Sequence, residues 1–174
     1  MLKWLSFLCV FTFCLAHSPG VQAGSAQFAY VDITEAMTSS VAAKHVRDML
    51  KQKIQTKQKE IDSLETEIKG MKADLEKRKN MMTPEANAEL TGQIRSKFRE
   101  YQRLVEDNQG AIDRENGRWT KKITETLSLV IEEIGKEKGF TVVFGKGQVL
   151  YADKSIDITS EVLNRLNSRT KGWF

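Results

Sequence analysis

The sequence has very little cysteine, histidine and proline. Its 174 residues include two of each. Both cysteines, Cys9 and Cys14, lie in an apolar N-terminal segment that we expect to be removed. The remaining chain is therefore expected to have no thiolate nucleophile and no disulfide. Its one histidine, His45, stands beside basic residues, and a lone helical histidine is more often a surface residue than a ligand or base.

Motifs of catalysis and cofactor binding are missing as well. Residues 145–147 (Gly-Lys-Gly) follow a predicted strand, but a phosphate-binding loop needs Ser or Thr after the lysine and here has Gly147. Glu132 and Glu133 lie among basic neighbours and show no acid–base pairing. No nucleic-acid-binding motif is present. We therefore predict no enzyme, no cofactor, no metal site and no nucleic-acid partner.

Residues 1–23 are predicted to be a cleaved signal peptide. Lys3 gives a positive start, Trp4–Ala16 is an unbroken run of apolar or small residues, and Val21–Ala23 offers small residues for signal peptidase. The apolar run is too short to cross a bilayer core of about 30 Å as a helix, which argues against a membrane anchor. We expect cleavage before Gly24 and export of the remaining chain.

Residues 40–137 are predicted to form two long helices that pair as a coiled coil. In the first helix, apolar residues recur with the a/d spacing of a heptad repeat, which is typical of paired helices. These positions are Leu50, Ile54, Ile61, Leu64, Ile68, Met71, Leu75 and Met82, with charged residues at Lys57 and Arg78. The second helix has a similar series: Ile94, Phe98, Tyr101, Val105, Asn108, Ile112 and Trp119.

A tight reversal is predicted between the two helices. Thr83 suits a helix N-cap, Pro84 suits the first turn, and Glu85 suits the positive end of the helix dipole. The first helix should therefore end near Asn80. At 1.5 Å per residue each arm would be roughly 60–80 Å long.

The end of this hairpin is strongly basic. Between residues 77 and 103, seven basic residues face three acidic ones. A positive end suggests an anionic partner such as lipid headgroups, lipopolysaccharide or an acidic protein segment, although charge runs are often only solvated helix surface. The basic residues are Lys77, Arg78, Lys79, Arg95, Lys97, Arg99 and Arg103.

The segments 24–39 and 138–174 are predicted to form a small, discontinuous β body. Strands are expected at Phe28–Val31, at Phe140–Phe144 and at Gln148–Ala152, the last two joined by a hairpin turn. Because an antiparallel helical hairpin returns to its starting point, the first two of these strands can join one sheet. The fold class is thus α+β, with a long helical hairpin projecting from a small body.

The end of the chain is predicted to close this body. Residues Ile158–Leu166 should form a short helix with Thr159 as its N-cap, and Arg169–Phe174 should be a loose tail. The body has only 53 residues, and cores of this size seldom persist without disulfides, metals or association. Association through edge strands is therefore expected, while the number of subunits stays open.

With this layout the chain resembles the Skp (OmpH-like) family of periplasmic chaperones. The most specific pieces are residues 28–32 (FAYVD) and residues 155–167 (SIDITSEVLNRLN). The resemblance implies a homotrimer with a β-barrel-like body made from the strands of three subunits, and three helical arms that enclose a cavity. It also implies an ATP-independent holdase in the periplasm that binds unfolded outer-membrane proteins and keeps them soluble.

These expectations define two sets of candidate residues. The basic residues of the hairpin end would capture clients or touch the membrane, with anionic lipid or lipopolysaccharide as further candidate partners. The oligomer core would be formed by strand residues: Phe28, Tyr30, Val31, Phe140, Val142, Phe144, Val149 and Tyr151. Two other functions stay open at this point, an envelope coiled-coil spacer without clients and a peripheral membrane protein that uses only its basic end.

Overall fold

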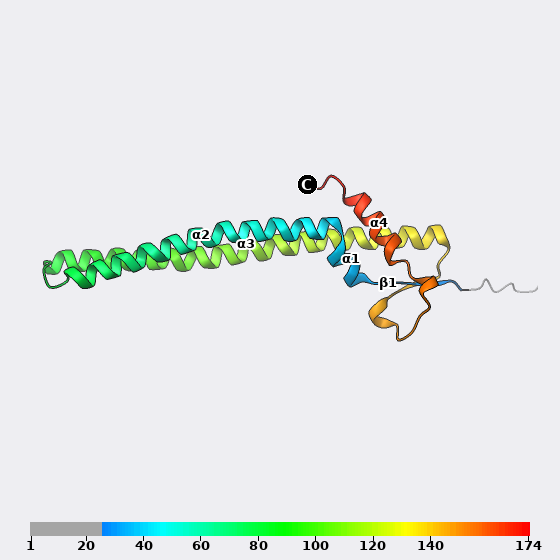
Figure 1. Cartoon of the computed structure of the whole chain (residues 1–174), viewed down its shortest axis with the longest axis horizontal. Coiled ribbons are helices and arrows are strands. Elements are labelled where there is room, and N and C mark those ends of the chain that lie inside the picture. Colours follow the sequence, from blue (N-terminus) through cyan, green and yellow to red (C-terminus); the bar gives the residue numbers. More distant parts are fainter. Residues whose placement is uncertain (1–25) are drawn as a thin grey trace, which may run out of the picture.

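The protein is elongated, with a long helical hairpin that projects from a small body (Figure 1). The computed structural model describes residues 26–174. Two helices form the arms of the hairpin, α2 (Val41–Arg78) and α3 (Pro84–Lys138). The predicted signal peptide and its cysteines lie outside the described residues. Among the helices that the structure describes, none combines the length and apolar character that a membrane span requires.

Local caps set the ends of the arms. The Thr83 hydroxyl accepts a hydrogen bond from the Ala86 N–H at 3.2 Å, and Pro84 is the first residue of α3, which confirms the predicted reversal. Helix α2 ends at Arg78, two residues earlier than predicted. At its other end the Ser40 hydroxyl caps α2 by accepting from the Ala43 N–H at 3.2 Å. Helix α3 ends at Lys138 and is capped by Gly139, whose φ of 69° is a left-handed conformation that glycine adopts without strain.

The body contains a two-stranded parallel sheet. Strand β1 (Phe28–Val31) pairs with β2 (Val142–Gly145), so the predicted joining of these segments in one sheet is confirmed. The predicted strand at 148–152 is wrong. The chain instead makes a 3₁₀ turn, η1 (Lys146–Gln148), which is closed by a hydrogen bond from the Val149 N–H to the Lys146 carbonyl at 3.1 Å. Lys146 is held by an ion pair with Asp32, which draws the turn toward the end of β1 instead of extending β2 into a hairpin.

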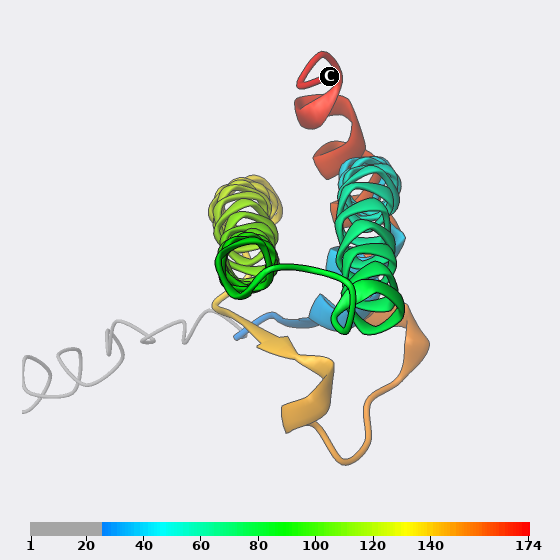
Figure 2. The same ribbon diagram turned by 90° about the vertical axis from the view of Figure 1, so that its left-hand side faces the viewer.

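Short helices complete the body. Helix α1 (Ile33–Ser39) was not predicted from the sequence. It is capped by Asp32, whose carboxylate accepts a hydrogen bond from the Glu35 N–H at 2.9 Å. The short 3₁₀ helix η2 (Lys154–Ile156) precedes the closing helix α4 (Thr159–Thr170). The prediction that Thr159 is the N-cap of α4 is wrong, because α4 begins at Thr159 with Ile158 as its N-cap. The Thr159 hydroxyl accepts a hydrogen bond from the Asp32 N–H at 2.9 Å and caps no N–H of α4. Viewed along the arms, α4 and the β2–η1 segment lie on opposite sides of the hairpin axis (Figure 2).

The prediction of a loose C-terminal tail is also wrong. Helix α4 continues to Thr170, and Trp173 packs against the hydrophobic core of the body. The aromatic rings of Trp173 and Phe174 provide the physical reason, because they meet Trp119 on α3 with centroid distances of 6.1 and 4.9 Å. No periodicity in the tail itself could indicate this contact.

The hydrophobic core joins the body to the bases of both arms. Buried residues come from β1, α1, the first turns of α2, the last turns of α3, and α4. The core therefore extends beyond the segments 24–39 and 138–174. Its members include Ala29, Val31, Ala36, Ala42, Val46, Leu50, Ile123, Leu127, Val130, Ile134, Ile158, Val162 and Leu166.

The pairing of the arms follows the predicted heptads on α2 better than on α3. Leu50, Leu64 and Ile68 are buried, but Ile54 is half-exposed. On α3 the predicted seam positions Phe98 and Val105 are exposed. Lys97 reaches Glu67 of α2 at 3.2 Å, and this places the 97 side of α3 toward its partner and leaves Phe98 at the edge. A second ion pair between the arms joins Lys53 and Glu115.

Candidate functional site

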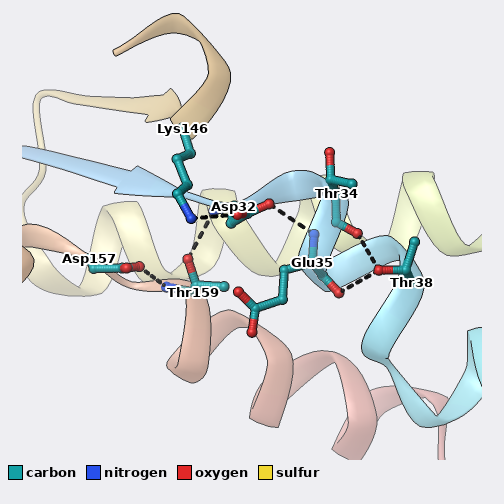
Figure 3. Close-up of polar contacts among 7 residues, drawn as sticks. All are labelled: Asp32, Thr34, Glu35, Thr38, Lys146, Asp157 and Thr159. Carbon is teal, nitrogen blue, oxygen red and sulfur yellow. Dashed lines mark hydrogen bonds and ion pairs between the residues drawn. The ribbon is translucent and has the colours of Figure 1, made fainter. Parts of the chain in front are cut away.

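The two sequence pieces that carry the family resemblance meet in a polar cluster at the end of β1 (Figure 3). The Asp32 N–H donates to the Thr159 hydroxyl at 2.9 Å, and the Asp32 carboxylate lies 2.8 Å from the Lys146 ammonium. The Thr159 N–H donates to Asp157 at 2.8 Å. This body polar cluster (Asp32, Lys146, Asp157 and Thr159) joins residues that are 127 positions apart in the chain.

The electrostatics of the body polar cluster indicate a structural role. Hydrogen bonds from Lys146 and from the Glu35 N–H hold the pKa of the Asp32 carboxyl below its usual value. Burial by itself would raise the pKa of Asp157. Hydrogen bonds from Thr159 and Tyr30 outweigh this effect of burial, so the pKa of Asp157 lies below its usual value. Both groups are thus stabilised as charged acceptors, which is unsuitable for a general acid. In residues 26–174, no three His, Cys, Asp or Glu side chains are grouped as metal ligands would be.

These lowered pKa values predict acid sensitivity of the body. A carboxyl that ionises more readily in the folded state stabilises the fold above its unfolded pKa of about 3.9, and this contribution is lost as pH falls through the folded pKa. Asp157→Asn keeps an acceptor for Thr159 and removes the charge. We expect its urea midpoint to fall less than that of the wild type between about pH 5 and pH 2.

A matched variant isolates this effect from general acid unfolding. Asp48 is exposed on α2, and none of the ion pairs of the described residues includes it. Asp48→Asn should therefore retain the pH slope of the wild type. If Asp157→Asn also retains that slope, the charge of Asp157 does not contribute to the stability of the body.

The structure divides the predicted basic residues of the hairpin end into two groups. Three of them are paired with carboxylates: Arg78 with Asp74 at 3.0 Å, Lys79 with Glu76 at 2.8 Å, and Lys97 with Glu67 at 3.2 Å. The hydrogen bond that the Lys97 ammonium donates to Glu67 raises the pKa of Lys97, which keeps that ammonium charged. Lys97 is also the one member of the predicted set that lies partly buried between the arms.

The other four basic residues, Lys77, Arg95, Arg99 and Arg103, are exposed and form no ion pair within residues 26–174. Arg95, Arg99 and Arg103 are spaced four residues apart, so they form a basic row along one face of α3. Like charges at this spacing repel one another weakly. An anionic partner would relieve this repulsion, so the row is suited to bind one. At 1.5 Å per residue it extends about 12 Å along the arm.

Exposed apolar residues lie on the same stretch of α3 as the basic row. Phe98 is 44% exposed and Val105 is 37% exposed. The ring of Phe98 stacks with Tyr101 at a centroid distance of 6.2 Å, and the Lys72 ammonium lies 5.6 Å from the same ring. This surface was not predicted from the sequence, because Phe98 and Val105 were assigned to the seam between the helices. We call the basic row together with Phe98, Tyr101 and Val105 the distal arm surface.

The predicted oligomer-core residues also divide into two groups. Tyr30 and Val31 are buried within the chain itself, whereas Phe28, Val142 and Phe144 are 47%, 40% and 40% exposed. Phe28 and Phe144 lie beside each other with ring centroids 6.2 Å apart. Tyr151 in the loop after η1 is 86% exposed, and Phe140 and Val149 are partly buried. The sheet thus presents an apolar face that the described chain does not cover.

The structure thus combines long paired helices with a small α+β body and carries charged and apolar surfaces along the arms. The family model of the outer membrane protein (OmpH-like) family matches residues 27–166. The chain therefore belongs to the OmpH-like family, which is not a family of enzymes.

Two further proteins are similar to this chain, one in sequence and one in fold. An uncharacterized protein from Aquifex aeolicus (strain VF5) is 26% identical over 143 residues, which cover 82% of this chain and 87% of that protein. The crystal structure of a candidate outer membrane chaperone (OmpH-like) from Caulobacter crescentus CB15 superposes with a TM-score of 0.77. The match covers 83% of this chain and 85% of that one at 20% identity, so it supports the likeness of the fold.

Proposed function

We propose that this chain is a nucleotide-independent holdase of the periplasm that binds unfolded outer-membrane proteins between its arms. The observation that carries the proposal is the distal arm surface, where exposed Phe98 and Val105 share one stretch of α3 with three arginines that form no ion pair within residues 26–174. An unfolded client needs many weak, adaptable contacts, which exposed apolar side chains supply. Charged side chains speed encounter more than they strengthen the final complex.

A trimer with a shared body is part of the same proposal. The exposed face of the two-stranded sheet, with Phe28, Val142 and Phe144, is typical of a surface that another copy covers. Strand β2 has one unpaired edge in the described chain, because its partner β1 lies on the other side. Three copies associated through these edges would close a barrel-like body and hold three arms around a cavity.

Charge reversal at the basic row and at Lys77 tests the capture step. In the variant Lys77→Glu, Arg95→Glu, Arg99→Glu and Arg103→Glu, we expect slower association with a urea-unfolded outer-membrane protein and a smaller salt dependence of the rate. Surface attraction is screened over about 8–10 Å at physiological salt, so the dissociation rate should change little. Stopped-flow fluorescence of a labelled client measures both rates.

The matched control reverses four exposed lysines elsewhere, which changes the net charge equally. Lys44, Lys51, Lys59 and Lys154 belong to none of the described ion pairs, and the control should retain most of the wild-type rate. If both variants slow association equally, net charge rather than the basic row governs capture. If the wild type in excess does not prevent client aggregation, the holdase proposal fails and an envelope spacer becomes the better interpretation.

A further inference from the structure

The last four residues of the chain fold back onto the base of the hairpin. After α4 ends at Thr170, Gly172 adopts a φ of 96°, a conformation that side-chain-bearing residues rarely adopt. The Trp173 N–H donates to the Thr170 carbonyl at 3.2 Å, which closes the turn. This turn directs Trp173 and Phe174 toward α2 and α3.

The two rings of this tail lie on a surface made by both arms. Phe174 stacks on His45 of α2 with centroids 4.0 Å apart, and it meets Trp119 of α3 at 4.9 Å. The Lys122 ammonium lies 4.0 Å from the centroid of the Trp173 ring and 5.1 Å from that of Trp119. Cations at such distances are attracted to the faces of aromatic rings. We call His45, Trp119 and Lys122 the aromatic platform.

Trp119 of the platform is fixed within α3, whereas Phe174 of the tail remains half-exposed. Trp119 lies within the 55-residue helix α3 and packs against the hydrophobic core. Phe174, in contrast, is 49% exposed. Within the described chain, Trp173 is held by one backbone hydrogen bond, by contact with the hydrophobic core and by the Lys122 ammonium. Phe174 is held by its ring contacts with His45 and Trp119. Most of these contacts are made by aromatic rings, so another segment with aromatic side chains can make similar ones.

We propose that the aromatic platform binds aromatic side chains of an extended client segment, and that Trp173 and Phe174 occupy it as an internal competitor. This inference rests on the proposed holdase function. Transmembrane β-barrels carry girdles of aromatic residues at both membrane interfaces, and an unfolded barrel protein exposes them. Lys122 favours an aromatic ring over an aliphatic side chain of similar area, because the attraction depends on the electrons of the ring face.

Two tail variants test the competition in the full chain. Trp173→Ala combined with Phe174→Ala removes the competing rings. Gly172→Val keeps both rings but disfavours the left-handed turn, and no atom lies within 4 Å of the added Cβ. Lys171→Ala is the matched control, since it changes the same segment without altering any ring. Binding is measured by fluorescence anisotropy of a short labelled peptide with adjacent tryptophan and phenylalanine, compared with a peptide that has two leucines.

We expect the double tail variant to bind the aromatic peptide about tenfold more tightly than the wild type. This factor corresponds to a wild-type platform that the tail leaves open about a tenth of the time. Gly172→Val should give a smaller gain, and Lys171→Ala should match the wild type. Adding Lys122→Met to the double variant should reduce the preference for the aromatic peptide over the leucine peptide. This substitution is at an exposed position, so it should leave the helical circular dichroism unchanged.

Equal binding of the aromatic peptide by the wild type and the double tail variant would overturn the proposal. An unchanged aromatic preference after Lys122→Met would also overturn it. Client aggregation assays on the same proteins separate this result from the holdase proposal. Protection of clients without any tail effect on peptide binding would disprove the platform alone, whereas tail-controlled peptide binding without client protection would disprove the holdase.

Discussion

Ile68→Asp is expected to open the distal half of the hairpin and leave the body folded. Ile68 is 4% exposed, at the centre of the interface between the arms. Loss of its packing and placement of a carboxylate there should destabilise the paired arms by at least about 3 kcal/mol. We expect this loss to exceed the stability that the narrow two-helix interface provides. Hydrogen exchange should therefore accelerate between residues 61 and 105, while amides of the body core retain their protection.

Thr66→Asp provides the control for this experiment. Thr66 is exposed on the same helix, so the same charge there should change exchange only slightly. If Ile68→Asp leaves residues 61–105 as protected as in the wild type, the described pairing of the arms is incorrect. If the body also unfolds, the arms and the body form one cooperative unit.

The second large effect is expected at the exposed face of the sheet. Val142→Lys combined with Phe144→Lys should convert the proposed trimer into monomers, because charges on an edge strand oppose both apolar association and strand pairing. Both side chains are 40% exposed within one chain, so the fold of the single chain should persist. Light scattering at micromolar concentration measures the association, and circular dichroism checks the helices.

Leu129→Lys is the matched control, because Leu129 is 52% exposed but lies on α3 outside the sheet. This variant should retain the assembly of the wild type. A wild type that is monomeric at micromolar concentration would contradict the proposed trimer. An unchanged assembly of the double lysine variant would place the interface elsewhere on the molecule.

Local signals account for the parts of the fold that the sequence predicts well. The reversal at Thr83 and Pro84 depends on neighbouring residues alone, and the α2 seam repeats over several turns. The α3 seam was predicted incorrectly at Phe98 and Val105 because apolar residues occupy two adjacent stripes of that helix. The choice between them depends on the partner helix, where Glu67 attracts Lys97.

Distant contacts account for what the sequence could not predict. The turn after β2 depends on the ion pair between Lys146 and Asp32, which are 114 positions apart. The tail depends on Trp119, which belongs to another element. For the candidate site, net charge indicated the hairpin end, but only the structure distinguishes its paired from its unpaired basic residues. The exposed Phe98 was missed for the same reason as the α3 seam.

The parallel pairing of β1 with β2 has a consequence for the order in which the chain can fold. The hairpin forms from residues that are neighbours around Thr83, and it can close progressively from its turn. The hydrogen bond from the Gln27 N–H to the Thr141 hydroxyl, in contrast, joins residues that are 114 positions apart. Closure of the arms brings these segments together and so shortens the effective loop. Asp32 reaches its partner Thr159 only when almost the whole chain is available. The first strand to be synthesised is therefore among the last to be paired, and β1 remains an unprotected edge until the arms have closed.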